Sequence, residues 1–563
     1  MAADLTRVVA IACAWLWALD VHPADAAVAT DVPRESRVHQ YSAEVAAGLV
    51  RVDVRACLDR AASAAPLQLL ADPDLVRFAR DLRVGGPTSE LLMPRVTKPF
   101  VPVRFAGNVL IVPSNTGCLR YWVDLDAAAR EGSGLRRSAA RRGADMKTSA
   151  DLWLLKPRLR GKDRIDLSVS LPPGIEMSAP WTRAVATTSG DPEDAPWRAT
   201  VQTGSSAVRT HRYQIERSPE TSWGAVVAFG RFRPQLIVLP DGARIEVSVL
   251  DGTPSPDVAR LGHWVEGIAR QVLGVHGRFP VRALQVLLVP LLATEGAGTA
   301  RTAATQTPMP ALLPKTAPAR GTPEAVGFGR IIRDGGTAAE LQIVQTAALS
   351  ALRADWTASH EFSHLLLPLL AEPGGWISEG FADYYQNLLM ARAGEYTEKE
   401  AWRRLIAGFE RGRGDGHYTD SLQEVMQRNG ENALMRRYWT GAIVALLVDV
   451  ELRAHNLRKG SASNDRAPSE SLDTLLGKLS HCCLPAQASW TREQLFTRLD
   501  ALAGRKLFVG VHEVWEETSA YPDYQDVLRQ LGVIGDGRGV RLDNRAPLAS
   551  VRRAIMRQRG SVQ

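Results

Sequence analysis

The sequence predicts a multidomain α+β protein in which an antiparallel β domain precedes a mainly helical part. Two patterns predict this order: apolar residues alternate with polar ones in several stretches between residues 100 and 250, and they recur at helical spacing from residue 256 onward. The length of 563 residues also suits several ordinary domains. We therefore expect a β-rich domain over residues 30–255, further domains over 256–395 and 396–535, and a basic tail over 536–563.

The composition is that of a globular protein, with 45% hydrophobic and 23% charged residues. Lys and Arg number 68 against 61 Asp and Glu, which leaves a net charge of +7. Because this excess is small and partly gathered in short Arg clusters, we expect no nucleic-acid partner. The sequence has neither a Gly-Lys-Ser/Thr phosphate loop nor a Gly-x-Ser-x-Gly elbow, so nucleotide hydrolysis and serine hydrolase chemistry have no support.

Residues 1–29 have the layout of a secretory signal peptide. Arg7 precedes an apolar run over residues 8–19, and small-residue cleavage sites follow at 24–26 and 27–29. The run is shorter than the roughly 20 residues that span a bilayer. We expect a periplasmic or extracellular protein with no membrane span after cleavage. An N-terminal membrane anchor and a buried N-terminal helix are the alternatives.

Export would allow disulfides among the cysteines that remain after cleavage. Cys13 lies in the removed segment, which leaves Cys57, Cys118, Cys482 and Cys483. We expect Cys57 to pair with Cys118, because both lie in the N-terminal region. For the adjacent Cys482 and Cys483, a bridge and free thiols are equally open.

The elements of the first half follow from the period of the apolar residues. Between residues 165 and 171 every second residue is apolar, which predicts a strand with one buried face. The apolar stretches 236–239 and 245–249 flank Pro-Asp-Gly at 240–242 and predict a hairpin. From residue 256 the spacing is helical, so we place a domain boundary near residue 255.

In the second half, residues 284–292 are apolar except for Gln285, which predicts a buried strand. Residues 296–323 are mostly Ala, Thr, Pro and Gly, and we interpret them as a loop that is either disordered or functional. The pattern from 341 to 532 is mainly helical, and Thr491 and Gln494 form a capping box. The Arg-rich residues after 535 predict a solvated tail, with a basic helix over 550–559 as the alternative.

One short motif in the helical part requires a chemical explanation. His360, Glu361 and His364 form the pattern His-Glu-x-x-His, in which two imidazoles four residues apart lie on one face of a helix and can share a metal ion. Roughly 0.01 accidental copies are expected in a chain of this composition. Asp355 or Thr357 can cap the start of the helix, and a proline four residues after the motif ends it. The alternative is a pair of core histidines.

Catalytic zinc usually has three protein ligands and one open position, so we expect a third ligand downstream. Glu379 is the candidate, because it lies near the start of a second predicted helix that the turn over 368–375 allows to return antiparallel. Asp383, one helical turn later, can accept the free N–H of a ligating histidine. We therefore expect one zinc ion on His360, His364 and Glu379. Alternatively, Glu379 and Asp383 are ordinary exposed helix carboxylates.

With three ligands on the metal, Glu361 is left to act as a general base toward a water molecule that attacks a carbonyl. The oxyanion that forms calls for a hydrogen-bond donor. Tyr438, which precedes an apolar helix over 443–450, is the first candidate, with a core tyrosine as the alternative. His417, after a Gly-rich stretch, is the reserve candidate, with a loop histidine as the alternative.

These residues resemble the motifs of the gluzincin metallopeptidases, most closely those of the glycyl aminopeptidase family, a relative of the aminopeptidase N family. The resemblance rests on His360-Glu361-x-x-His364, on Trp376-x-x-Glu379-Gly380-x-x-x-Tyr384-Tyr385, and on Tyr438-x-x-Gly441. It implies the same zinc ligands, with Glu361 as base, Asp383 behind a ligand and Tyr438 as oxyanion donor. It also implies a thermolysin-like zinc catalytic domain over 256–395, completed by helices over 396–535.

The chain departs from that pattern at several points. Only fourteen residues separate His364 from Glu379, fewer than in either family. No Gly-x-Met-Glu-Asn segment occurs, which removes the amine-binding carboxylate of the aminopeptidase N relatives, and the C-terminus does not resemble a PDZ module. Residues 327–332 fit an edge strand that pairs with an extended substrate, and equally a structural strand.

The sequence therefore predicts an exported zinc metallopeptidase that acts on a peptide or protein substrate, with aminopeptidase activity and internal cleavage both open. One alternative is a non-catalytic, metallopeptidase-like scaffold that binds peptides or cell-envelope partners. A second is a zinc hydrolase of non-peptide amides or esters. Glu361 and Tyr438 favour an enzyme over a scaffold, because binding alone needs neither a base nor an oxyanion donor.

Overall fold

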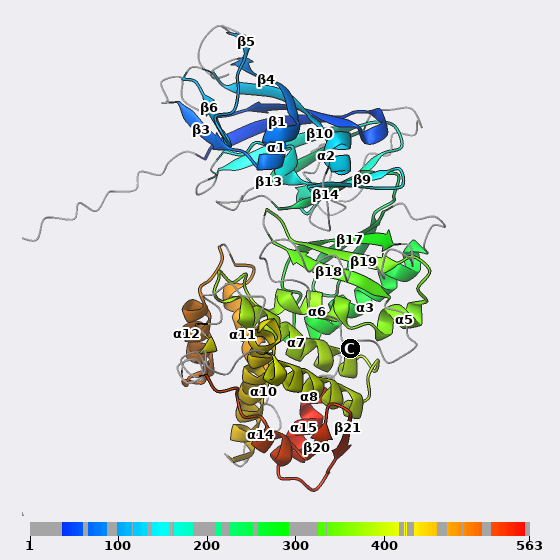
Figure 1. Cartoon of the computed structure of the whole chain (residues 1–563), viewed down its shortest axis with the longest axis vertical. Helices are drawn as coiled ribbons and strands as arrows, with labels where there is room; N and C mark the ends of the chain where they lie inside the picture. The colour runs from blue at the N-terminus through cyan, green and yellow to red at the C-terminus, as the bar shows by residue number, and fades with distance from the viewer. Residues whose placement is uncertain are drawn as a thin grey trace, which may run out of the picture. The chain divides into compact units, whose positions relative to one another are not determined.

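The computed structural model describes residues 36–59, 66–86, 98–114, 116–131, 138–157, 159, 163–183, 209–215, 224–250, 257–291, 325–333, 335–415, 421, 422, 424, 433–458, 470–486, 488–508, 510 and 519–557. Figure 1 shows their helices and strands. The predicted signal peptide, the loop over 296–323 and His417 lie outside these residues. Within them, no helix is long and apolar enough to cross a membrane.

The first part of the chain is rich in β-structure, as predicted. An eight-stranded sheet has the order β12-β13-β10-β1-β2-β7-β4-β5, a four-stranded sheet has the order β11-β14-β9-β8, and β3 pairs with β6. β1 and β10 run parallel, whereas the other neighbours in these sheets run antiparallel. The strands are β1 (Val38–Val45), β2 (Arg51–Cys57), β3 (Leu67–Leu70), β4 (Ala79–Gly86), β5 (Lys98–Pro102), β6 (Val109–Val112), β7 (Cys118–Asp124), β8 (Ala139–Arg142), β9 (Asp145–Ser149), β10 (Arg164–Leu171), β11 (Glu176–Ser178), β12 (Thr182–Arg183), β13 (Arg209–Ile215) and β14 (Val226–Gly230). Short helices between them are η1 (Ala47–Leu49), α1 (Pro73–Phe78), α2 (Leu125–Glu131) and η2 (Ala150–Leu152).

Alternation of apolar side chains builds the core of this part. In β10 every second residue from Ile165 to Leu171 is buried, while the residues between them are partly exposed. Cys57 in β2 faces Cys118 in β7 across the register, and the two form a disulfide, so the expected pairing is confirmed. Most of the buried apolar residues up to Phe229 form one cluster, and a second cluster begins at Ile237. A small third cluster joins Val226 and Ala228 to later residues such as Leu287.

The next sheet has five strands in the order β15-β16-β17-β19-β18. They are β15 (Gln235–Val238), β16 (Arg244–Val249), β17 (Ala283–Leu291), β18 (Val326–Ile332) and β19 (Ala338–Val344). β16, β17 and β19 run parallel, and β15 and β18 are antiparallel edges. β15 and β16 are the predicted hairpin, and β16 pairs with β17, so the hairpin shares a sheet with later strands and belongs to the second core. Periodicity identifies a strand without showing which sheet it joins.

Helices pack against this sheet and against one another (Figure 1). They are α3 (Val258–His276), α5 (Leu349–Ala354), α6 (Thr357–Ser363), η4 (His364–Leu366), α7 (Gly375–Arg392), α8 (Glu398–Gly414), α10 (Leu434–Arg458), α11 (Leu472–Cys483), α12 (Arg492–Ala503) and α14 (Gln525–Leu531). α3 and α6 contact the sheet, and α7 contacts α6, α8 and α10. Thr491 and Gln494 form the predicted capping box at the start of α12.

The described residues of the expected solvated tail, 536–557, are folded instead, and they include a helix close to the alternative one over 550–559. β20 (Val533–Asp536) and β21 (Gly539–Leu542) form a hairpin, and α15 (Ala549–Met556) follows it. Arg552 is only 1% exposed, and its guanidinium donates hydrogen bonds to backbone carbonyl groups and to Glu398 Oε1. The prediction was wrong because an Arg side chain can satisfy buried acceptors, which a count of charges along the sequence does not show.

Candidate metal centre

The two histidines of the motif lie at the end of a short buried helix. Every residue of α6 from Thr357 to Ser363 is buried, and His364 follows as the first residue of η4. The Asp355 carboxylate accepts hydrogen bonds from the backbone N–H groups of Thr357, at 2.9 Å, and Val326, at 3.0 Å. The N-cap of α6 is Trp356, which makes no side-chain cap bond, but Asp355 binds the first backbone N–H of the helix and attaches its start to β18.

The structure brings Glu379, in α7, close to both histidines. Glu379 Oε2 lies 3.3 Å from His360 Nε2 and 3.7 Å from His364 Nε2, and the three side chains can each offer a ligand atom within 4.8 Å of the others. Ligands about 2.0–2.2 Å from a tetrahedral zinc ion lie roughly 3.3–3.6 Å from one another. Two imidazole nitrogens and one carboxylate oxygen at this spacing fit one zinc ion, and the fourteen-residue connection is long enough to bring them together.

Each histidine has a polar partner on its other ring nitrogen. Gln386 Oε1 lies 2.9 Å from His360 Nδ1, and Ser378 Oγ lies 3.0 Å from His364 Nδ1. The amide oxygen of Gln386 can only accept a hydrogen bond, so it keeps a hydrogen on His360 Nδ1 and directs Nε2 toward Glu379. The sequence analysis missed both partners. The signal was available, because Ser378, Glu379 and Gln386 are polar positions in a largely apolar helix.

Asp383, the expected partner of a ligating histidine, is fully buried, so it is not an ordinary exposed carboxylate. Its Oδ1 lies 3.4 Å from His360 Nδ1, farther than the Gln386 oxygen. Neither carboxylate oxygen has a hydrogen-bond partner within the described part of the chain. Burial raises the pKa of Asp383, while the neighbouring His360 opposes the rise. Gln386 thus makes the shorter contact with His360 Nδ1, and the Asp383 carboxylate makes a second, longer contact with the same nitrogen.

Glu361 lies beside the same group of residues. Burial, with a contribution from the charge of Glu379, raises the pKa of Glu361 to about 7, although His360 opposes the rise. Its side chain passes over Gly329 of β18, where a Cβ atom would lie 2.5 Å from Glu361 Cγ. Any larger residue at 329 would displace the carboxylate. Like Gln386 and Ser378, Gly329 was not predicted from the sequence to have this role.

Tyr438 approaches the site because α7 and α10 are unusually close. A Cβ atom at Gly380, the residue after Glu379, would lie 2.3 Å from the backbone of Gly441. A Cβ atom at Gly441 would lie 2.5 Å from the carbonyl oxygen of Trp376. The two helices can approach this closely only because neither residue has a side chain. This explains why glycine accompanies Glu379 and Tyr438 in the motifs.

The Tyr438 side chain is 2% exposed and lies in the electrostatic environment of the site. Burial raises its pKa well above the usual value, and the negative charges of Glu379 and Asp383 raise it further. The hydroxyl is therefore protonated at every physiological pH and can donate a hydrogen bond. A wholly apolar core tyrosine would not feel these two carboxylates. His417, the reserve donor, lies outside the described residues.

Two arginines that the sequence analysis missed also act on the site. Arg333, just after β18, donates hydrogen bonds to the carbonyl oxygens of His364 and Leu367. It thereby fixes η4, the helical turn that follows α6. Burial would raise the pKa of Glu379, but the two histidines and Arg437 more than offset this and lower it. The position of Arg437 directly before Tyr438 was the available signal for it.

β18 lies at one edge of the five-stranded sheet and contacts α6. Among the strands that the structure describes, it pairs with β19 alone, through residues from Val326 to Ile332. The predicted edge strand over 327–332 is therefore present beside α6.

No family model matches the chain, and no curated protein matches its sequence. Among solved structures, it is similar to an aminopeptidase N family protein from Idiomarina loihiensis, with 13% identity, coverage of 88% of this chain and 78% of that one, and a TM-score of 0.59. It is also similar to a variant of the M1 zinc metallopeptidase of Deinococcus radiodurans bound to a Tyr-Ser-Ala substrate, with 11% identity, coverage of 87% and 95%, and a TM-score of 0.45. The first likeness shows that the chain has an aminopeptidase N-like fold; the second is too distant to add to the argument.

Proposed function

We propose that this protein is an exported zinc-dependent metallopeptidase that hydrolyses peptide bonds. The observation that carries the proposal is the spacing of His360, His364 and Glu379, which suits one zinc ion, with the buried Glu361 carboxyl beside them. The aminopeptidase N-like fold supports it, because the five-stranded sheet, α6 and α7 would then correspond to a thermolysin-like catalytic unit. Export rests on the pattern of residues 1–29 alone.

Zinc held in such a site supplies Lewis acidity toward a substrate carbonyl and toward water. Glu361 takes the proton of the attacking water and later returns it to the leaving amine, for which a pKa near neutrality is well suited. The Tyr438 hydroxyl donates a hydrogen bond to the oxyanion that develops on the carbonyl oxygen. Gln386 and Ser378 hold the two imidazoles in the orientation that leaves their Nε2 atoms toward the ion.

The edge position of β18 supports an extended peptide as the substrate. An unpaired strand edge offers backbone N–H and C=O groups that can pair with a peptide backbone, which gives affinity without demanding a particular side chain. Residues 327–332 would then align the scissile bond beside Glu361, whose side chain lies over Gly329.

The test is a peptide-library assay on the purified protein, with and without a chelator. We expect cleavage that stops when the chelator removes zinc and returns when zinc is added back. Libraries with free and acetylated N-termini distinguish an aminopeptidase from an enzyme that cuts internally. Stoichiometric zinc without cleavage of any peptide would favour a peptide-binding scaffold. Cleavage of esters or non-peptide amides alone would favour a different zinc hydrolase.

A further inference from the structure

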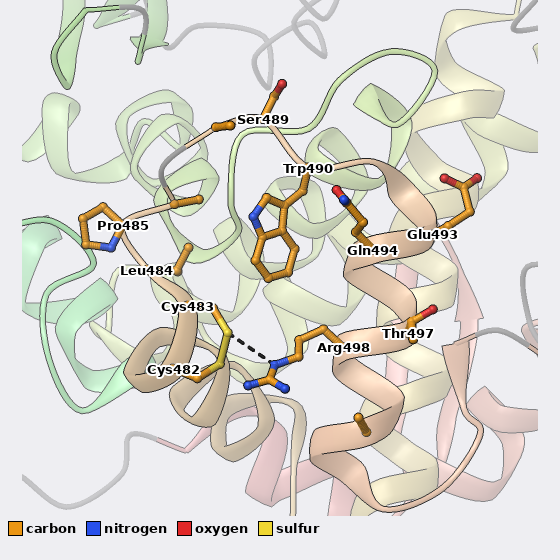
Figure 2. Close-up of a pocket in the computed structure, with 13 residues that line it drawn as sticks. Cys482, Cys483, Leu484, Pro485, Ser489, Trp490, Glu493, Gln494, Thr497 and Arg498 are labelled. Carbon is orange, nitrogen blue, oxygen red and sulfur yellow. Dashed lines mark hydrogen bonds between the residues drawn. A yellow bond between two sulfur atoms is a disulfide. The ribbon is translucent and has the colours of Figure 1, made fainter. Parts of the chain in front are cut away.

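A cavity of about 950 Å³ lies between the end of α11, the segment 484–490 and α12 (Figure 2). None of the residues that line it belongs to the metal centre. One side is apolar and the other carries polar side chains: Leu484, Pro485 and Trp490 on the first, and Gln494, Thr497 and Arg498 on the second. This size is within the range of about 300–1,000 Å³ that is typical of small-molecule sites, so a small polar compound can enter.

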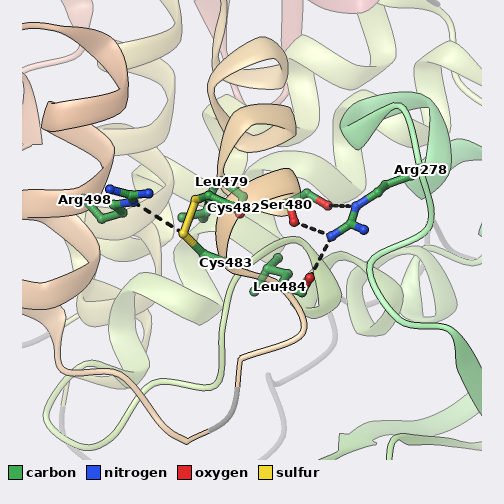
Figure 3. The surroundings of a disulfide bond; sticks show 7 residues. All are labelled: Arg278, Leu479, Ser480, Cys482, Cys483, Leu484 and Arg498. Carbon is green, nitrogen blue, oxygen red and sulfur yellow. Dashed lines mark hydrogen bonds between the residues drawn. A yellow bond between two sulfur atoms is a disulfide. The ribbon is translucent and has the colours of Figure 1, made fainter.

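The cavity wall contains a disulfide between neighbouring residues. Cys482 and Cys483, the last two residues of α11, are bridged and line the cavity (Figures 2 and 3). Of the two states left open by the sequence, the structure has the bridge. The side chain of Cys482 is exposed. The Cys57–Cys118 disulfide is less exposed, because Cys118 is only 1% exposed within the eight-stranded sheet.

Each sulfur has a neighbour that suits its reduced form. Arg498 Nε lies 3.4 Å from Cys483 Sγ and directs its N–H toward it, and a guanidinium stabilises a thiolate (Figure 3). Cys482 Sγ lies 3.4 Å from the carbonyl oxygen of Leu479, which can accept a hydrogen bond from a thiol. Cys483 is therefore the better leaving group, and the exposed Cys482 is the sulfur open to attack.

The backbone around the disulfide is held in place by bonds that do not depend on the bridge. Arg278 donates hydrogen bonds to the carbonyl oxygens of Ser480 and Leu484, on either side of the two cysteines (Figure 3). At the far end of the segment, Trp490 pairs with the backbone around Leu370. The disulfide can therefore open while the surrounding chain keeps its place.

We propose that Cys482 and Cys483 form a thiol–disulfide exchange site for low-molecular-weight thiols. A thiolate attacks Cys482 Sγ, the bond between the two protein sulfurs breaks, and Cys483 leaves as a thiolate beside Arg498. A second thiol then attacks the mixed disulfide at the external sulfur. This releases Cys482 as a thiol and forms the disulfide of the small thiol, so two thiols are oxidised for each protein disulfide reduced. The site needs neither zinc nor peptide hydrolysis.

The test uses the folded, oxidised protein and reduced glutathione as the probe thiol. After incubation, acid quenching and alkylation, mass spectrometry follows each cysteine. We expect Cys482 and Cys483 to become alkylated at least about tenfold faster than Cys57 and Cys118, of which Cys57 is half-buried and Cys118 is buried. When exchange is stopped early, glutathione should be found on Cys482. Equal rates for the two disulfides, or glutathione mainly on Cys483, would overturn the proposal.

A matched pair of variants tests the guanidinium. R498Q should slow the opening of the bridge about three- to tenfold, because Cys483 loses the charge that stabilises its thiolate, whereas R498K should retain most of the rate. The Cys57–Cys118 disulfide serves as an internal control, since it stays oxidised as long as the β domain is folded. If R498Q opens as fast as the unchanged protein, the role assigned to Arg498 is wrong.

Discussion

Glu361 and Tyr438 are the two residues on which the proposed chemistry depends directly. Glu361 belongs to the buried helix α6, and burial raises its pKa to about 7. The pKa of Tyr438 is raised so far that its hydroxyl keeps its proton. The first can therefore exchange a proton at neutral pH, and the second can only donate a hydrogen bond. Their roles are separable by substitutions that leave the three candidate ligands untouched.

Replacement of Glu361 by Gln should lower kcat by at least about 10²-fold, because the amide cannot take a proton from water. The zinc content after dialysis should not change, since His360, His364 and Glu379 remain. Steady-state rates on a cleaved peptide and metal analysis of the same sample measure the two effects. A kcat within a few-fold of the original value would rule out Glu361 as the base.

Replacement of Tyr438 by Phe keeps the aromatic ring and removes the hydroxyl. We expect the barrier to rise by about 2.7 kcal/mol or more, roughly a hundredfold in kcat, with little change in KM, because the oxyanion exists only beyond the ground state. The melting temperature serves as the control for the buried ring. An unchanged kcat would shift the donor role to another residue, with His417 the next to test.

At the scale of elements, the contact between α7 and α10 determines whether the site can form. Glu379 comes from α7 and Tyr438 from α10, and the two helices meet at Gly380 and Gly441 with no room for a Cβ atom. The distance between the helices thus sets the distance between a candidate metal ligand and the candidate oxyanion donor.

G441A should separate these helices. The added Cβ would lie 2.5 Å from the Trp376 carbonyl oxygen, so we expect a loss of about 1–3 kcal/mol in stability together with a lower kcat. G267A is the matched control, because Gly267 in α3 has no atom near the position of a Cβ, and Ala there should stabilise the helix by up to about 1 kcal/mol. Thermal melting of both variants checks this, and equal stability of the two would contradict the close-contact argument.

At the scale of the whole molecule, a buried carboxylate joins the two β-structured parts of the chain. Glu340 in β19 forms ion pairs with Arg330 in β18 and with Lys147 in β9, which belongs to the four-stranded sheet of the first part. Burial would raise the pKa of Glu340, but the attraction of the two cations lowers it to about 2. The ionised carboxylate is therefore part of what stabilises the contact between the two parts.

The ion pairs of Glu340 with Lys147 and Arg330 make the stability of the protein depend on pH. Because the pKa of Glu340 in the folded protein, about 2, lies below its usual 4.5, the stabilisation is fully present above pH 4.5 and is lost as the pH falls toward 2. E340Q should cost about 3–5 kcal/mol at pH 7, since it leaves the buried Lys147 and the half-buried Arg330 without their partner. Its melting temperature should also fall less steeply than that of the unchanged protein between pH 4.5 and 3. Parallel curves for the two proteins would contradict the linkage.

Features that depend on neighbours along the chain could be predicted from the sequence. The buried face of β10, the capping box at Thr491 and the pairing of His360 with His364 on one helical face follow from the fixed periods of strands and helices. The pairing of Cys57 with Cys118 was expected only because both lie in one region. Among the site residues that were missed, Ser378 and Gln386 are marked only as polar positions in a largely apolar helix, and Gly329 shows no such local pattern.

The sequence by itself therefore determined the types of the elements, their order and the residues able to bind a metal. Only the tertiary structure decided which sheet β15 and β16 join, that Arg552 is buried, and that Glu340 meets cations from two sheets. The physical reason is that secondary structure repeats along a few residues, whereas burial, close glycine contacts and ion pairs depend on segments that are distant in the chain and meet only once it has folded.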